Sequence, residues 1–188
     1  MKKNISGRTA VAPVPVLIVG SFDRNGTPDA MNAAWGGQCG YNEIALNLST
    51  NHKTTENIRE SKAFTVSIGT AETLLVCDYV GLVSGHKENK IERLGLSYSM
   101  SKFVNAPVID IFPLTLECEM ISINSELGET RIVGRVVNML ADENILDETG
   151  HIDYDKLHPI YYDSEPRSYR EIAGIIGKAF HDGAKLKL

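Results

Sequence analysis

The sequence predicts a mainly β protein, an antiparallel barrel with Greek-key connections and short helices between its strands. Segment 14–22 is rich in β-branched residues and runs into the turn sequence DRNG, and segment 28–35 follows as a returning strand. Two longer strand-like segments, 112–127 and 129–142, meet at Gly128. Neither pair leaves room for a crossover helix, so we expect antiparallel pairing in place of parallel βαβ units.

The segments between these two hairpins alternate between strand and helix patterns. Segment 43–49 predicts a third strand, and segment 50–64 predicts a short helix that Thr54 and Thr55 cap. Segment 64–69 is again rich in β-branched and aromatic residues. We therefore expect a fourth strand directly after this helix.

The middle of the chain predicts two further helices. Segment 71–85 is expected to be a buried helix ended by glycine, and segment 88–96 a short amphipathic helix with Gly95 near its C-terminal end. The residues from about 150 to 188 are irregular, aromatic and rich in Pro and Gly. We expect one domain over residues 1–188, in which this last segment packs on the barrel or on a dimer partner.

Apolar and acidic residues alternate along the first strand of the long hairpin. The predicted core face carries Leu114, Leu116, Cys118 and Met120. Glu117 and Glu119 lie between them and are expected to face solvent, since successive side chains of a strand point to opposite faces. We expect no catalytic role for these two carboxylates.

Composition excludes several classes of function. The chain has 188 residues and a net charge of −5, and its Lys and Arg residues form no block. Nucleic-acid binding is not expected, because such proteins present a basic face or stripe. Cys39, Cys77 and Cys118 stand far apart, which favours a reduced cytoplasmic protein with all three buried. No apolar run reaches the roughly 20 residues that a membrane span requires.

Familiar catalytic motifs are missing from the sequence. The histidines are His52, His86, His151, His158 and His181. They are widely separated and form neither HxH nor HExxH, so we expect no metal site. GxSxG, GxxxxGK[ST] and GxGxxG are also absent, so we expect no protein nucleophile and no Rossmann dinucleotide site.

Two loop-to-helix segments have the composition of a phosphate site. Segment 49–58 passes from a strand end through hydroxyl residues and Lys53 to a helix N-terminus, where free N–H groups favour an anion. Segment 84–96 is a second such passage, with Ser84 and Gly85 at its start. Taken alone, each is more typical of an ordinary capped helix or surface turn than of a phosphate site.

The order of these segments resembles the flavin reductase-like family, whose members have an FMN-binding split barrel and include the flavoredoxins. The family's M-[TN]-x-x-W segment corresponds to residues 31–35, its Ser/Lys/Thr loop to 49–55 and its S-G-x-x-x-x-K-[FI] segment to 84–91. A late GHIDYDKLHPIYYDSEPRSY sequence is also similar to the family's C-terminal segment. The resemblance covers nearly the whole chain.

The resemblance implies an FMN site and assigns its residues. The implied cofactor-binding residues are Met31, Asn32, Ala33, Ala34, Trp35, Ser49, Lys53, Thr54, Thr55, Ser84, Gly85, Lys90, Tyr161 and Tyr162. Backbone around Trp35 would approach the flavin ring, and Lys53, Thr54, Thr55 and Ser49 would hold the phosphate. Lys90 would place positive charge near the pyrimidine edge of the ring. Either Tyr161 or Tyr162 would cover the flavin.

The resemblance also implies a homodimeric oxidoreductase that passes hydride or electrons through FMN, with NAD(P)H as donor. Asn32 and Asn89 replace residues common in the family, a threonine and an aspartate, which leaves the donor and acceptor open. Two other functions fit the same segments: an FMN electron carrier without its own turnover, and a split-barrel module that binds another ligand. The apolar segment 172–180 is typical either of a dimer contact or of the chain's own core.

Overall fold

The computed structural model describes residues 1–5, 11–172 and 174–186. The strands in this part of the chain are β1 (Val14–Pro15), β2 (Leu17–Phe22), β3 (Pro28–Ala33), β4 (Trp35–Gln38), β5 (Glu43–Ser49), β6 (Ala63–Ile68), β7 (Tyr98–Met100), β8 (Pro107–Ile109), β9 (Leu114–Glu126), β10 (Glu129–Ala141), β11 (Ile160–Asp163) and β12 (Ser168–Glu171). The helices are α1 (Lys53–Ser61), α2 (Leu74–Leu82), α3 (Lys90–Arg93) and α4 (Tyr154–Leu157), with 3-10 turns at Glu143–Ile145 and Asp182–Leu186.

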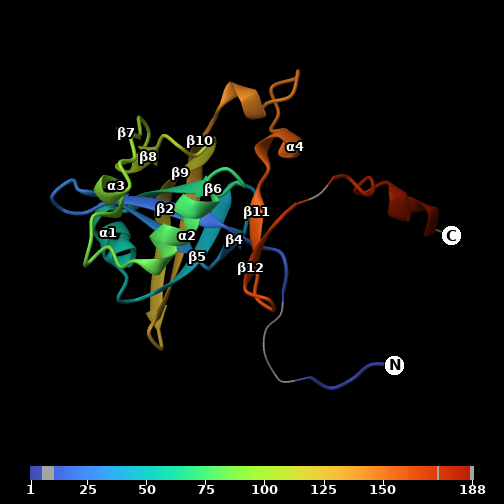
Figure 1. Ribbon diagram of the computed structural model, residues 1–188, viewed down its shortest axis with the longest axis horizontal. Helices are drawn as coiled ribbons and strands as arrows, with labels where there is room; N and C mark the ends of the chain where they lie inside the picture. Colours follow the sequence, from blue (N-terminus) through green and yellow to red (C-terminus); the bar gives the residue numbers. More distant parts are fainter. Residues whose placement is uncertain (6–10, 173, 187–188) are drawn as a thin grey trace.

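Most strands join one curled antiparallel sheet (Figure 1). In the described residues this sheet has seven strands in the order β3-β2-β6-β9-β10-β5-β4, and β9 and β10 form its long hairpin. Two smaller antiparallel sheets, β1-β11-β12 and β7-β8, flank it. The mainly β fold and its antiparallel barrel are therefore confirmed.

The curl of the sheet is clearest at Ala34. Ala33 ends β3 at one edge of the sheet, and Trp35 begins β4 at the opposite edge, where it pairs with Asn47 of β5. One residue can connect opposite edges only if the sheet bends until the edges meet. The predicted single strand over 28–35 is thus wrong, because the chain leaves one edge and joins the other within it.

Both faces of the curled sheet are covered. The inner core consists of Leu17, Val19, Met31, Ala33, Ile44, Leu46, Leu48, Ile58, Phe64, Val66, Cys118 and Ile132. Ile58 comes from α1, so this helix closes one end of the barrel. The outer core, under α2 and α3, consists of Val16, Ile18, Ala30, Cys77, Val80, Ile91, Ile109, Phe112 and Ile160. Strand β2 contributes alternate residues to each core and is buried on both faces.

The helices differ from prediction at their ends, and α2 is not the buried helix expected, because it packs by one face only and leaves Leu75 and Leu82 exposed. His52, and neither Thr54 nor Thr55, occupies the N-cap of α1, because both threonines lie inside the first turn. Helix α2 ends at Leu82, three residues before the glycine that was expected to end it, and the residue after Leu82 is extended. Gly95 follows the short α3 with φ of 61°, as expected for a C-terminal glycine.

Two side chains contradict the burial predictions. Glu117 is buried instead of solvent-facing: segment 104–107 packs over this part of the sheet, and the carboxylate accepts a hydrogen bond from the Asn138 side chain. Glu119, two residues further along the strand, is exposed as predicted. Cys39 is exposed, unlike Cys77 and Cys118, because it lies in the loop between β4 and β5.

The C-terminal segment packs on the sheet only in part. Leu157 of α4 and Ile160 of β11 are buried, and β11 pairs with β1. Residues 174–186 extend away from the sheets (Figure 1), and their described side chains are exposed. Of the predicted apolar segment 172–180, Ala173 lies outside the described residues. The described remainder does not belong to the chain's own core.

Candidate functional site

Two adjoining cavities lie where α2 crosses β3. The first, here called the ring cavity, has a volume of about 330 Å³ and is lined by Val14, Pro15, Val16, Asn32, Ala33, Ala34, Trp35, Asp78, Gly81, Leu82, Tyr162 and Tyr169. The second, the polar cavity, has a volume of about 250 Å³ and is lined by Asp29, Met31, Asn32, His52, Lys53, Thr54, Val80, Gly81, Leu82, Val83, Ser84, Gly85 and Lys90. Asn32, Gly81 and Leu82 line both, so the cavities form one site with two ends.

The junction of the two cavities is set by the close approach of α2 to β3. The Asn32 amide donates a hydrogen bond to the carbonyl of Cys77 at 3.0 Å. A Cβ at Gly81 would lie 3.2 Å from Cβ of Asn32, closer than most real contacts. Glycine at position 81 therefore lets the helix sit against the strand.

The ring cavity has aromatic walls. Trp35, which is 52% exposed, lines it together with Tyr162 and Tyr169, whose ring centroids lie 6.0 Å apart. The Tyr169 hydroxyl donates a 2.8 Å hydrogen bond to Oδ1 of Asp78 on α2. Burial and this hydrogen bond to a carboxylate raise the pKa of Tyr169, so the phenol remains a protonated donor.

The polar cavity is built around Asp29 of β3. Nζ of Lys90 lies 3.2 Å from Oδ1 of Asp29, and the Thr54 hydroxyl donates to Oδ2 at 2.8 Å. Both members of this ion pair are almost fully buried. Lys90 also donates to the carbonyl of Val80 at 3.4 Å. A Cβ at Gly85 would lie 2.5 Å from Oδ1 of Asp29, so this position also requires glycine.

Lys53 is the more accessible cation of the polar cavity. Its Nζ lies 3.4 Å from Oδ2 of Asp23, and its side chain is 20% exposed. Burial raises the pKa of Asp23, but hydrogen bonds from the N–H groups of Thr27 and Asn25 and the contact with Lys53 outweigh it and lower this pKa overall. Asp23 is therefore a carboxylate that holds Lys53 at the mouth of the cavity.

The N-terminus of α1 opens toward the same cavity. This helix has nine residues, and its N-cap residue His52 makes no side-chain capping hydrogen bond. Its first-turn N–H groups thus lack a side-chain acceptor, and the positive end of the helix dipole adds to the charge of Lys53. This end of the site suits an anion.

The structure brings most of the predicted site residues together. Those that line the two cavities are Met31, Asn32, Ala33, Ala34, Trp35, Lys53, Thr54, Ser84, Gly85, Lys90 and Tyr162. Ser49, Thr55 and Tyr161 line neither cavity. The buried Thr55 hydroxyl donates to the Ser49 carbonyl, which fixes the start of α1. Tyr161 neighbours Tyr162 on β11, where successive side chains point to opposite faces.

Four important residues of the site were not predicted, namely Asp29, Asp78, Gly81 and Tyr169. Asp78 had a visible signal, since it is the lone charge within the apolar sequence LLVCDYVGL of α2. The other three become part of the site only when α2, β3 and β12 pack together, and no local sequence pattern predicts this packing.

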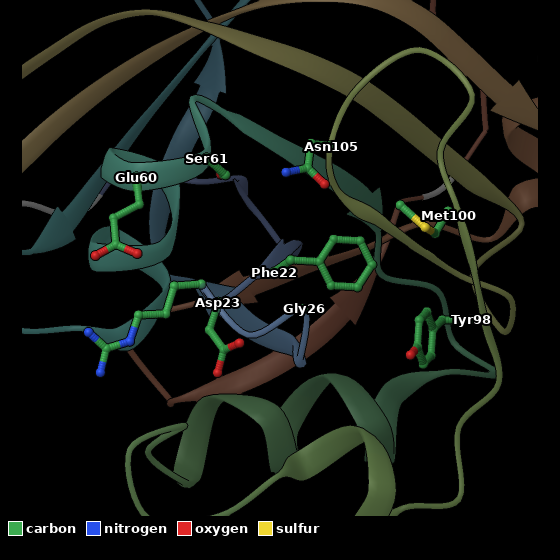
Figure 2. Close-up of a pocket in the computed structure, with 9 residues that line it drawn as sticks. Phe22, Asp23, Gly26, Glu60, Ser61, Tyr98, Met100 and Asn105 are labelled. Atoms are coloured by element: carbon green, nitrogen blue, oxygen red, sulfur yellow. The ribbon is translucent and has the colours of Figure 1, made fainter.

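A third cavity, of about 380 Å³, shares none of its lining residues with the ring cavity or the polar cavity. It is lined by Phe22, Asp23, Arg24, Gly26, Glu60, Ser61, Tyr98, Met100 and Asn105. Figure 2 shows the Phe22 ring with Tyr98 and Met100 to one side and the carboxylates of Asp23 and Glu60 to the other. None of the predicted site residues lines it, and its two carboxylates disfavour a phosphate.

Comparison with known proteins identifies the family of this fold and site. The family model described as flavin reductase like domain matches residues 9–172. The chain belongs to the flavin reductase-like family. The predicted family and split-barrel fold are thereby confirmed, and membership supports a flavin-binding redox function.

Solved structures of the family resemble the chain over nearly its full length. The flavoredoxin of Desulfovibrio vulgaris (Miyazaki F) is 33% identical with a TM-score of 0.92, covering 97% of this chain and 100% of its own. The flavoredoxin of Methanosarcina acetivorans is 25% identical with a TM-score of 0.91, covering 99% of each chain. An FMN-binding protein of Thermus thermophilus is 17% identical with a TM-score of 0.77, covering 95% and 97%, which shows a common fold.

The described residues hold no group of three or more His, Cys, Asp or Glu side chains placed for a metal ion. Within the same residues, no helix has both the length and the apolar character that crossing a membrane requires.

Proposed function

We propose that this protein binds FMN, with the flavin ring in the ring cavity and the phosphate in the polar cavity. One observation carries the proposal: two cavities that share Asn32, Gly81 and Leu82 have aromatic walls at one end and Lys53 with an uncapped helix N-terminus at the other. An elongated ligand with a flat ring and an anionic tail matches both ends.

Lys53 and the first turn of α1 would hold the phosphate. The charge of Lys53 would form a charge-assisted hydrogen bond, and the N–H groups of residues 53–55 would donate to the remaining phosphate oxygens. The Thr54 hydroxyl already donates to Asp29, so Thr54 would contribute through its backbone. Ser84 lines the same cavity, is exposed and offers a hydroxyl.

The junction of β3 and β4 would hold the flavin ring. Both are edge strands of the sheet, so among the described residues no strand pairs with one side of each. N–H groups of residues 32–35 would donate to the polar edge of the ring, and the small side chains of Ala33 and Ala34 let the ring approach. Trp35 and Tyr162 would border it from two sides.

Bound FMN would supply the redox chemistry, because its ring accepts two electrons as a hydride from NAD(P)H and returns them to an acceptor. The protein would bind and orient the ring and limit its contact with water. No side chain needs to act as acid or base in this transfer, and we assign no catalytic residue. Lys90 faces the phosphate end and is paired with Asp29, so its influence on the ring would be small.

An absorption spectrum of the purified protein with added FMN, followed by anaerobic NADH or NADPH, tests the proposal. We expect a perturbed flavin spectrum that bleaches when nicotinamide is added. A spectrum identical to that of free FMN would contradict flavin binding and favour a split-barrel module for another ligand.

A second candidate function is electron carriage between proteins. Identity of 33% to a flavoredoxin over nearly the whole chain favours it. In that case FMN would survive dialysis, and NADH and NADPH would reduce it slowly. Rapid turnover of either nicotinamide by the purified protein would contradict the carrier function.

We also propose that the protein is a homodimer. Exposed apolar side chains lie on the sheet at Ile121, Val137 and Met139 and in the tail at Ile175 and Ile176. Apolar side chains left exposed on the sheet and in the tail could pack against a second copy of the chain, which would remove them from water. Light scattering coupled to size-exclusion chromatography tests this proposal. We expect a particle with twice the mass of the 20.6 kDa chain, and a particle with the mass of one chain would contradict the dimer.

A further inference from the structure

We propose that Asp78 sets the redox balance of the flavin by placing a fixed negative charge in the ring cavity. The inference rests on the proposed binding of FMN in this site. Asp78 would disfavour the reduced flavin relative to the oxidised flavin and so lower the midpoint potential.

The position of Asp78 is fixed by helix and hydrogen bond together. It lies in the middle of α2, three residues before Gly81, where the helix contacts β3. Its Oδ1 accepts the 2.8 Å hydrogen bond from Tyr169, whose ring packs against Tyr162. The carboxylate therefore has a defined place at the wall of the ring cavity.

The charge of Asp78 is uncompensated in the described part of the chain. No described cation forms an ion pair with it, and it is the one residue with a formal charge among those that line the ring cavity. The two lysines of the site, Lys53 and Lys90, line the polar cavity, and each is paired with a carboxylate of its own. The field at the ring end is thus negative.

This field discriminates between the two redox forms. The oxidised flavin ring is neutral, whereas the fully reduced ring carries a negative charge near neutral pH. A carboxylate at the cavity wall repels only the charged form, and the low dielectric of a partly buried cavity strengthens the repulsion. Asp78 should therefore weaken binding of reduced FMN more than binding of oxidised FMN.

If Asp78 acted only by holding Tyr169 in place, the potential would respond equally to loss of their hydrogen bond and to loss of the charge. Asp78→Asn removes the charge but keeps an oxygen that accepts from the Tyr169 hydroxyl. Tyr169→Phe removes the hydrogen bond but keeps the charge. The two variants separate electrostatics from anchoring, and Asp110→Asn, an exposed aspartate that lines neither cavity, is the matched control.

The test is the midpoint potential of the bound flavin, measured against a reference dye, together with the dissociation constant of oxidised FMN. For Asp78→Asn we expect a potential about 30 mV higher, which for a two-electron couple equals a tenfold change in the ratio of the two affinities. Because the oxidised ring is neutral, its affinity should change much less than that of the reduced ring in this variant. The potential should not rise in Tyr169→Phe, which keeps the charge, and Asp110→Asn should leave both quantities unchanged.

An unchanged potential in Asp78→Asn with FMN still bound would overturn the inference, and so would an equal rise in Tyr169→Phe. Asp78→Ser carries the same prediction if Asp78→Asn fails to fold. Loss of oxidised FMN from both charge-removing variants, but not from Tyr169→Phe, would also overturn it, since Asp78 would then hold the ring. Failure of the wild-type protein to bind FMN is seen first and refutes the proposed function itself.

Discussion

Nζ of Lys90 lies 3.2 Å from Oδ1 of Asp29, and both side chains are almost completely removed from solvent. Thr54 donates to the other oxygen of the same carboxylate. Asp29 thus joins α1, α3 and β3 beneath the polar cavity. The floor of the proposed phosphate site is held by a buried ion pair, and the cation available to a ligand is Lys53.

Lys90→Met should destabilise the fold by about 3–5 kcal/mol, because it leaves the buried Asp29 carboxylate without its cation. Adding Asp29→Asn should recover a large part of the loss, since no unpaired charge then remains buried. Urea unfolding of the wild type, Lys90→Met and the double variant measures both effects. Equal urea midpoints for Lys90→Met and the wild type would show that the Lys90–Asp29 ion pair does not stabilise the fold.

Lys53→Ala should weaken FMN about tenfold or more while riboflavin, which lacks the phosphate, binds almost as before. Lys87→Ala removes the same charge from an exposed lysine that lines neither cavity and should change neither affinity. Equilibrium titration of each variant with both flavins gives the comparison. An equal loss for FMN and riboflavin would refute the phosphate assignment.

Gly81→Ala should lower the affinity for FMN several-fold with little loss of stability. The added Cβ meets Asn32 at 3.2 Å and pushes α2 away from β3, whereas alanine favours the helix itself by about 1 kcal/mol over glycine. Gly37→Ala is the control, because a Cβ there would meet nothing within 4 Å. Unaltered FMN binding in Gly81→Ala would mean that the helix position does not define the site.

Nδ1 of His158 lies 2.5 Å from Oε1 of Glu171, just before the C-terminal tail begins. The hydrogen bond to Glu171 raises the pKa of His158 above its usual 6.5. Because the folded pKa is raised, the contact stabilises β12 fully below pH 6.5 and loses this effect as pH rises through the folded pKa. An NMR titration of the His158 ring checks the shift, and Glu171→Gln should return the pKa toward 6.5. A wild-type value at or below 6.5 would contradict it.

The sequence indicated the β-rich architecture because its signals are local. The DRNG turn and the alternation along 112–127 each specify a hairpin without reference to the rest of the chain. The break at Ala34 was not visible, since a curled sheet places neighbouring residues at opposite edges. The burial of Glu117 was missed for a related reason, because segment 104–107 covers that part of the sheet only once the chain has folded back over it.

Site residues could be predicted where they belong to a motif within one continuous segment of the sequence. Residues 31–35, Lys53 and Lys90 were found in this way, but their partners were not. Asp29 and Asp23 hold the two lysines from β3 and from the turn before it, and Tyr169 reaches Asp78 from β12. These pairings depend on tertiary packing, which one sequence does not reveal.

Trp35 is a built-in reporter of whether a flavin ring occupies the cavity beside it. Trp35 is the sole tryptophan of the sequence, so its fluorescence reports on the ring cavity alone. Titration with FMN should quench this fluorescence saturably, in parallel with the change in flavin absorption and with one FMN per chain. Flavin that binds without quenching Trp35, or no saturable binding at all, would contradict the account.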